Sequence, residues 1–428
     1  NINTKVTDYL KMGLNIGLRN QESNTPGISP DNTAYMNPFY QATRMLPNLP
    51  MFAPTGEYTS SRNGAGLMSP IASVEESGYQ KYLMNIFQGT ANLEFFVPGV
   101  KGLTAKLQGA YDYEAQEGKV WTQPYTTMMR DQEQVSGNYV AQYVVPGISK
   151  TTLRQSHSAN YRKTLQGSLN YSNTFNDHSV GGLLLYEFYK GTGNVFSAGA
   201  SNFPITVIHE INYGSKEDED LIASTGSSSP EITRAGVVAK FNYGFRDKYL
   251  FEAAARWDAS SNFAKQNRWK MFPGAGLGWV VSKEDFFQDI VDNGSIDFLK
   301  FKTSFGRTGN DRANAGLFSY MQTFAQQTAP GLVIGGQPIA AVYSANIPNS
   351  GLKWEESQMF NIGFESRLFK NFGFDFEWFY RYTYDILGGV GGLYPASIGG
   401  YHASLANIGT MDNRGFDAQL RYNNTFGD

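Results

Sequence analysis

The chain has 428 residues with 35 basic and 38 acidic side chains, which gives a formal net charge of −3. Aromatic residues make up 14% of the chain, too many for a disordered protein, and the near-neutral charge argues against an electrostatic nucleic-acid binder. No run of about 18 residues is apolar throughout, which excludes a transmembrane helix. A transmembrane β-barrel is not excluded, because the strands of such a barrel alternate between apolar and polar residues and are polar on average. The mean hydropathy of −0.38 is compatible with this.

Alternation of apolar and polar residues is the dominant pattern along the chain. It is clearest in 372–381, where Phe372, Phe374 and Phe376 share one face with Trp378 and Tyr380. Counting such segments predicts about twelve strands in an all-β, antiparallel protein. They lie near 7–19, 83–97, 102–115, 158–175, 179–190, 232–245, 248–260, 270–282, 297–307, 356–369, 372–386 and 411–425.

The connections between these strands are alternately short and long. The short ones are 98–101, 176–178, 246–247 and 370–371; the long ones are roughly 20–82, 116–157, 191–231, 308–355 and 387–410. This rhythm is typical of an up-and-down outer-membrane barrel with short periplasmic turns and long external loops. Two connections fit less well. Residues 261–269 are short for an external loop, and 283–296 are long for a periplasmic turn, with room for one or two helical turns.

A large soluble all-β protein, such as a propeller or a sandwich array, is the competing interpretation of the same pattern. Propeller blades would need a repeated motif, and we find no internal repeat. A face of Phe, Trp and Tyr with charged residues opposite fits lipid outside and a wet lumen inside better. The charged residues predicted to face inward are Glu252, Arg256, Lys300, Lys302, Glu365, Arg367, Asp375, Glu377, Arg381 and Asp417. Their mixed sign favours pairing with a plug surface over an open ion-selective pore.

No catalytic or metal-binding constellation is visible in the sequence. The chain has no cysteine, which removes disulfides, thiolate catalysis and Cys-bound metals. Its histidines are His157, His178, His209 and His402. They show no metal-ligand spacing, the acidic run 217–220 lacks the calcium-loop pattern, and the glycines of 388–392 are not followed by the Lys-Ser/Thr of a P-loop. We therefore predict no enzyme activity, no cofactor and no metal site.

Aromatic residues in the long external segments are the candidate contacts for a substrate or partner. They are Trp121, Tyr125, Tyr320, Tyr343, Tyr394 and Tyr401. Exposed rings stack on sugar rings or peptide side chains and offer a polar handle. The alternative is that they pack loops against each other. Trp257, Trp378 and Tyr380 fit lipid-interface anchors instead.

A series of short motifs runs through the second half of the chain. They are Arg-Trp-Asp-Ala-Ser-Ser-Asn-Phe at 256–263, Asn-Arg-Trp at 267–269, Phe-Pro at 272–273, Gly-Trp at 278–279, Ser-Lys-Glu-Asp-Phe-Phe at 282–287, 299–310, Leu-Lys-Trp-Glu at 352–355, 361–365, Asn-Ile-Gly at 407–409 and 413–417. In this order and spacing the chain resembles the barrel of the SusC/RagA family of TonB-dependent outer-membrane transporters. The resemblance covers nearly the whole chain and is strongest over 234–422. The family usually has Gly at Ala259 and Lys270 and a basic residue at Asn262, which leaves the local turn geometry open.

The resemblance implies a β-barrel of about 22 strands in the outer membrane of a Gram-negative bacterium. Residues 1–428 would be a partial transmembrane barrel with about twelve of these strands; the family's plug domain and TonB box are not found in them. It further implies active import of a glycan or a peptide, a SusD-like surface lipoprotein as lid, TonB acting through an N-terminal segment, and outer-membrane lipid around the barrel. A passive pore or a secretion-associated barrel without a plug is the alternative that the residues leave open.

Overall fold

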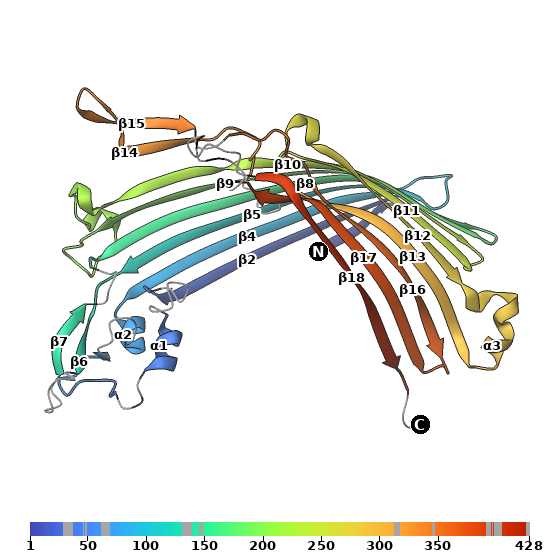
Figure 1. Ribbon diagram of the computed structural model, residues 1–428, viewed down its shortest axis with the longest axis horizontal. Coiled ribbons are helices and arrows are strands. Elements are labelled where there is room, and N and C mark those ends of the chain that lie inside the picture. The colour runs from blue at the N-terminus through green and yellow to red at the C-terminus, as the bar shows by residue number, and fades with distance from the viewer. Residues whose placement is uncertain are drawn as a thin grey trace.

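The computed structural model describes residues 1–28, 37–45, 47, 49–60, 69–130, 139–144, 149–311, 317–344, 347–390, 395, 397 and 405–424. Thirteen strands form one curved sheet (Figure 1) in the order β1-β2-β4-β5-β8-β9-β10-β11-β12-β13-β16-β17-β18. These strands are β1 (Ile2–Thr7), β2 (Leu10–Pro26), β4 (Gly78–Phe96), β5 (Leu103–Thr122), β8 (Thr152–Phe175), β9 (His178–Ser201), β10 (Leu221–Phe245), β11 (Tyr249–Ser260), β12 (Trp269–Val280), β13 (Ile296–Asn310), β16 (Glu355–Leu368), β17 (Phe372–Gly389) and β18 (Leu405–Tyr422). All neighbours in the sheet pair antiparallel in chain order. The predicted all-β, up-and-down architecture is confirmed.

Smaller elements lie within the long connections and in two shorter ones, 261–268 and 281–295. Two further sheets contain β14 (Phe324–Ile334) with β15 (Gln337–Ser344), and β3 (Thr59–Ser60) with β6 (Thr126–Arg130) and β7 (Tyr139–Val144). The α-helices are α1 (Pro38–Arg44), α2 (Pro70–Glu75) and α3 (Gln288–Asp292), and the 3₁₀ turns are η1 (Ile211–Tyr213), η2 (Asp218–Asp220), η3 (Lys265–Asn267), η4 (Val281–Lys283) and η5 (Asp285–Phe287). None of the helices in the described residues is long and apolar enough to cross a membrane.

The predicted strand count and several strand lengths need correction. The twelve expected strands are present, but β1 was missed, because it has six residues of which only Ile2 and Val6 are apolar. The expected loop 191–231 is largely strand, since β9 and β10 pair as far as Ala200 with Leu221. Where a strand extends past the membrane, neither of its faces has to be apolar. These parts of β9 and β10 are rich in Gly, Ser and Thr, and they show no alternation of apolar and polar residues.

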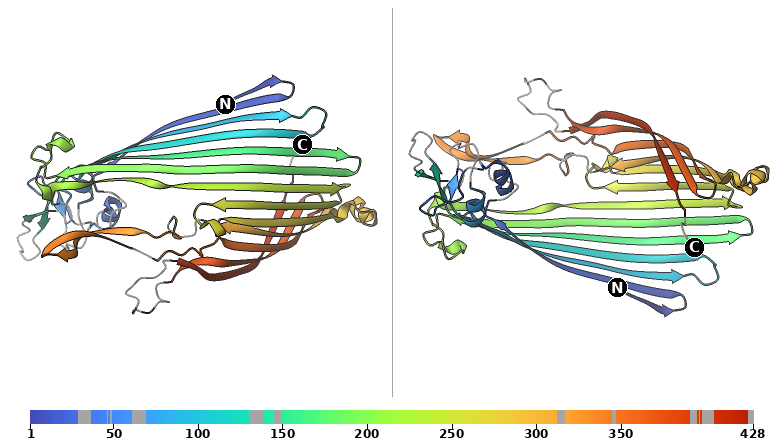
Figure 2. Two further views of the ribbon diagram at one scale, coloured as in Figure 1. Left: turned by 90° about the horizontal axis from the view of Figure 1, so that it is seen from above. Right: turned by 90° about the horizontal axis from the view of Figure 1, so that it is seen from below.

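The two ends of the sheet differ in the length of their connections (Figure 2). One end, the loop rim, carries the connections 27–77, 123–151, 202–220, 261–268, 311–354 and 390–404; the other, the turn end, carries 8–9, 97–102, 176–177, 246–248, 281–295 and 369–371. The expected alternation is confirmed, as is helical structure in 281–295. The tight hairpins use left-handed residues, such as Arg246 and Asp247 with φ of 52° and 50°.

The two faces of the sheet have opposite chemistry. Cross-strand register aligns Phe251, Leu277, Thr303, Ile362, Trp378 and Phe416 in one row. The neighbouring residues on the same strands form a row on the other face: Glu252, Gly276, Ser304, Asn361, Phe379 and Gly415. We call these the apolar face and the polar face. Most large residues of the apolar face are exposed, so this face requires an apolar environment rather than water.

Candidate functional site

The buried hydrophobic clusters among the described residues lie at the loop rim. In the first, Tyr125 packs with Ile28 and Ala72. Its hydroxyl lies 2.8 Å from Ser73 Oγ, and burial raises the pKa of Tyr125. Ser69 caps α2 by accepting a hydrogen bond from the Ala72 N–H at 3.2 Å, a common way to begin a helix. Ile28 and Ala72, which belong to the connection between β2 and β4, therefore pack onto the rim.

The second cluster holds the connection 202–220 against β4 and β5. Trp121 is 1% exposed and packs with Leu153, Ala200 and Phe203. The ring of His209 stacks on Trp121 with centroids 4.1 Å apart, and His209 Nδ1 lies 2.9 Å from the Tyr79 hydroxyl. An ion pair from Lys119 to Glu210, at 2.9 Å, adds a further link.

The third cluster brings several of the sequence motifs together. Trp354 packs with Phe263, Phe272 and Leu352, and Tyr320 lies against this group. Asn407 is bonded twice to Lys353: the Lys353 N–H donates to Asn407 Oδ1 at 3.0 Å, and Asn407 Nδ2 donates to the Lys353 carbonyl at 2.9 Å. The base of the connection 311–354 is thus fixed to β12 and β18.

A buried acidic residue at the rim is paired with a basic one. The buried carboxylate of Asp220 accepts hydrogen bonds from Lys150 Nζ at 2.6 Å and Asn202 Nδ2 at 3.1 Å. These hydrogen bonds lower the pKa of Asp220 to about 2, and the bond from Lys150 has the largest effect. Among the residues described, no group of His, Asp or Glu is placed to hold a metal ion.

The predicted aromatic contacts have different environments. Trp121 belongs to β5 rather than to a loop, and both Trp121 and Tyr125 are buried; the expectation of exposed rings is wrong for these two, which pack loops instead. Tyr320 is partly covered by the third cluster, whereas Tyr343 in β15 is 44% exposed. Tyr394 and Tyr401 lie outside the described residues.

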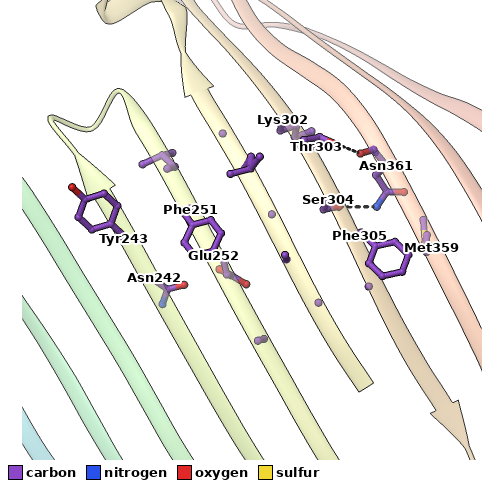
Figure 3. A pocket seen from close by; sticks show the side chains of 18 of the residues that line it. Asn242, Tyr243, Phe251, Glu252, Lys302, Thr303, Ser304, Phe305, Met359 and Asn361 are labelled. Carbon is purple, nitrogen blue, oxygen red and sulfur yellow. Dashed lines mark hydrogen bonds between the residues drawn. The ribbon is translucent and has the colours of Figure 1, made fainter. Parts of the chain in front are cut away.

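The polar face has a hollow of about 1200 Å³ that extends from β8 to β18. Gly274, Gly276 and Gly278 alternate along β12 and leave its floor without side chains. Figure 3 shows Tyr243, Phe251 and Phe305 on the near side of the sheet, and Asn242, Glu252 and Ser304 behind it. A backbone or a flat ligand can approach the sheet closely where the glycines lie.

Ion pairs cross the polar face between neighbouring strands. Lys302 lies between two carboxylates, 3.1 Å from Glu365 and 3.2 Å from Glu377. Lys240 pairs with Glu252 at 3.0 Å. Both signs are therefore present on this face, as the sequence predicted, and many of the charges are already compensated within the wall. Sequence reasoning did not find the glycine floor, although its Gly-x-Gly-x-Gly spacing at 274–278 is visible.

Comparison with known proteins places these features in a family. The family model described as TonB dependent receptor-like, beta-barrel, matches residues 32–427. The chain is 26% identical over 434 residues to TonB-dependent receptor P3 of Formosa agariphila, covering 99% of this chain and 39% of that protein. It is 27% identical over 195 residues to TonB-dependent receptor SusC of Bacteroides thetaiotaomicron, covering 44% of this chain and 18% of that protein.

Solved structures show the same fold. The RagAB peptide transporter matches with a TM-score of 0.76 at 19% identity, over 98% of this chain and 43% of that one. The chain thus spans less than half the length of these relatives.

Proposed function

The chain belongs to the TonB-dependent receptor-like β-barrel family, outer-membrane transporters of the SusC/RagA type, and on that premise we propose that it forms part of the barrel wall of an active importer of glycan or peptide nutrients. A SusD-like surface lipoprotein closes the mouth as a lid, and TonB supplies energy through a segment N-terminal to the residues described. The observation that carries this proposal is the family match over nearly the whole chain.

The two faces of the sheet support the role of a barrel wall. The apolar face exposes Leu277, Ile362 and Phe416, as a surface in contact with acyl chains does. The polar face would line the lumen. Because Lys302 is already balanced by two carboxylates, this face fits a neutral or mixed-sign neighbour, such as a plug, better than a stream of ions of one sign.

The loop rim supports a protein partner at the mouth. The β14–β15 hairpin projects from the sheet (Figure 1) and exposes Phe324 by 66% and Val342 by 71%. An isolated two-stranded hairpin is marginally stable in water, and exposed apolar patches mark interaction surfaces. Docking of the lid would cover both side chains and stabilise the hairpin.

The cargo class is proposed at the level of glycan or peptide. Aromatic rings such as those of Tyr320 and Tyr343 stack on sugars and on peptide side chains alike. The amides of Asn242 and Asn361 in the hollow offer donors and acceptors that suit hydroxyl groups and peptide bonds equally. The remaining candidate contacts of the sequence, Tyr394 and Tyr401, belong to the same proposal.

Co-purification from mildly solubilised outer membrane tests the lid. The intact receptor should retain a surface lipoprotein, and the double variant Phe324→Ser, Val342→Ser should lose most of it. The double variant Val100→Ser, Phe369→Ser is the matched control, because these two side chains are 45% and 62% exposed at the turn end, away from the mouth, and their change should leave the complex intact. If the unaltered receptor is recovered with no lipoprotein in any mild detergent, the result would favour a passive pore over the importer.

A further inference from the structure

The connection 281–295 at the turn end has a feature that import does not use. Among the described residues it is the turn-end connection with helical structure: η4, η5 and α3 follow one another between β12 and β13. It contains the motif Ser-Lys-Glu-Asp-Phe-Phe at 282–287. Other hairpins at the same end join their strands with as few as two residues, as 176–177 does. Joining β12 to β13 therefore does not explain the extra length of 281–295.

Glu284 fixes this connection to the end of the sheet. One carboxylate oxygen accepts from Trp279 Nε1 at 3.0 Å, and the other accepts from Lys248 Nζ at 3.2 Å. Both Lys248 and Glu284 are mostly buried. Gln288 Nε2 donates to the Ser282 and Glu284 carbonyls at 3.1 and 3.3 Å. The segment is therefore held in one position relative to β12.

Phe286 projects from this fixed segment and is 69% exposed. Its ring lies 6.5 Å from that of Trp279. Trp279 pairs in register with Tyr249 and Phe301 on the apolar face. Phe286 thus extends the apolar face past the end of β12. In the same connection, Ile290 of α3 is 39% exposed.

Charged residues alternate with these apolar ones along the connection. The Asp285 side chain is fully exposed, Asp289 is exposed, and Lys283 forms an ion pair with Asp247 at 3.2 Å. A segment with large apolar side chains beside exposed charges is the pattern of a chain lying in a membrane interface, with its rings in the acyl boundary and its charges in water.

We propose that the connection 281–295 is a lipid anchor, in which Phe286 and Ile290 insert into the membrane leaflet at the turn end and Glu284 positions them. The occupant is lipid because the exposed rings are continuous with the face that contacts acyl chains. The anchor is independent of cargo and lid; it fixes the depth of this part of the sheet in the membrane.

Fluorescence quenching by brominated lipid tests the anchor. The described chain has no cysteine of its own, so Phe286→Cys directs a thiol-reactive fluorophore to one place in these residues. The intact receptor is reconstituted in phosphatidylcholine vesicles with or without acyl-brominated lipid. The label at 286 should lose most of its emission in brominated vesicles, and the matched label at Asp285→Cys should keep it. Equal quenching at both positions, or none at 286, would overturn the proposal.

Two further measurements separate the other readings. Adding Glu284→Ala to Phe286→Cys should restore much of the emission, because the connection loses the hydrogen bonds that Glu284 accepts from Trp279 and Lys248. Unchanged quenching would refute the positioning role of Glu284. A label at 286 that is unquenched in vesicles but shielded in native outer membrane would show that a periplasmic protein, not lipid, covers the site. Lid binding and cargo uptake are measured separately, so failure here leaves the importer proposal standing.

Discussion

Trp354 donates its indole N–H to the backbone carbonyl of Arg268 at 3.1 Å. This bond joins the residue that precedes β16 to the short connection between β11 and β12, although 311–354 is among the longest connections of the rim. Its ring also packs against Phe263 and Phe272, with centroids 5.3 and 5.4 Å away. Motif residues that are far apart in the sequence therefore meet in one cluster that sets where the loops begin.

Trp354→Ala should destabilise the rim. Removing a buried aromatic ring costs about 3–5 kcal/mol through lost burial and the cavity left behind, and here the Arg268 carbonyl also loses its donor. Urea unfolding in detergent micelles measures the loss. Trp257→Ala is the control, because Trp257 is exposed on the apolar face and should cost clearly less. Equal losses would contradict the role given to the third cluster.

Phe376→Arg should impair membrane insertion, whereas Phe379→Arg should not. Phe376 pairs with Phe364 and Ala418, and Phe379 pairs with Asn361 and Gly415 on the other face. Arginine on the lipid side costs up to about 2–4 kcal/mol, a cost that is largest at the midplane and falls to about 0–1 kcal/mol near the interfaces, while substitutions facing the lumen are tolerated. Refolding titrations into lipid vesicles compare the two identical substitutions. If both cost the same, the facing of β17 is wrong.

Acid should loosen the attachment of the 202–220 connection. The folded pKa of Asp220, about 2, lies below its ordinary value of 3.8. The carboxylate therefore contributes stability above pH 3.8, and this contribution is lost as the pH falls from 3.8 through about 2. The protection factors for hydrogen exchange of amides near the start of β10, which compare each rate with the intrinsic rate at the same pH, should fall in that window. Asp220→Asn should abolish this change between pH 3.8 and about 2, whereas Asp218→Asn, at an exposed site, should retain it. If the change is the same in Asp220→Asn, protonation of Asp220 is not its cause.

The loop rim should face the outside of the cell. An epitope tag placed after Val207, in the exposed connection 202–220, should bind antibody on intact cells. A tag at Gly294, in the turn-end connection 281–295, should become accessible only after the outer membrane is permeabilised. Strand pairing extends through Ser228 and Asn194, so a tag at Ser228 would disturb β10. The reverse pattern of access would invert the orientation.

Sequence pattern located the lipid-facing strands because the membrane imposes a strict alternation on them. In β17, every second residue from Phe372 to Tyr380 is aromatic, and such a stretch has few other interpretations. Where strands rise past the lipid that constraint ends, and the paired parts of β9 and β10 near Phe196 and Gly226 carried no signal.

The candidate contacts were harder to predict because burial at the rim is decided by distant segments. Trp121 looked like an exposed loop residue, and nothing near it in the sequence shows that His209 and Phe203 return to cover it. The motifs identified the family, but the reciprocal bonds between Lys353 and Asn407 needed the fold. Tyr343 kept the exposure expected of it.

Energy-coupled uptake tests the central claim most directly. Cells that carry the intact receptor and the proposed lid lipoprotein are given fluorescent oligosaccharides or peptides too large for general porins, with and without an uncoupler and with TonB active or inactivated. The importer account predicts saturable uptake of one of the two cargo classes that stops when the proton gradient is dissipated or TonB is lost. Uptake that persists unchanged under both treatments and rises linearly with cargo concentration would show a passive pore and contradict the account.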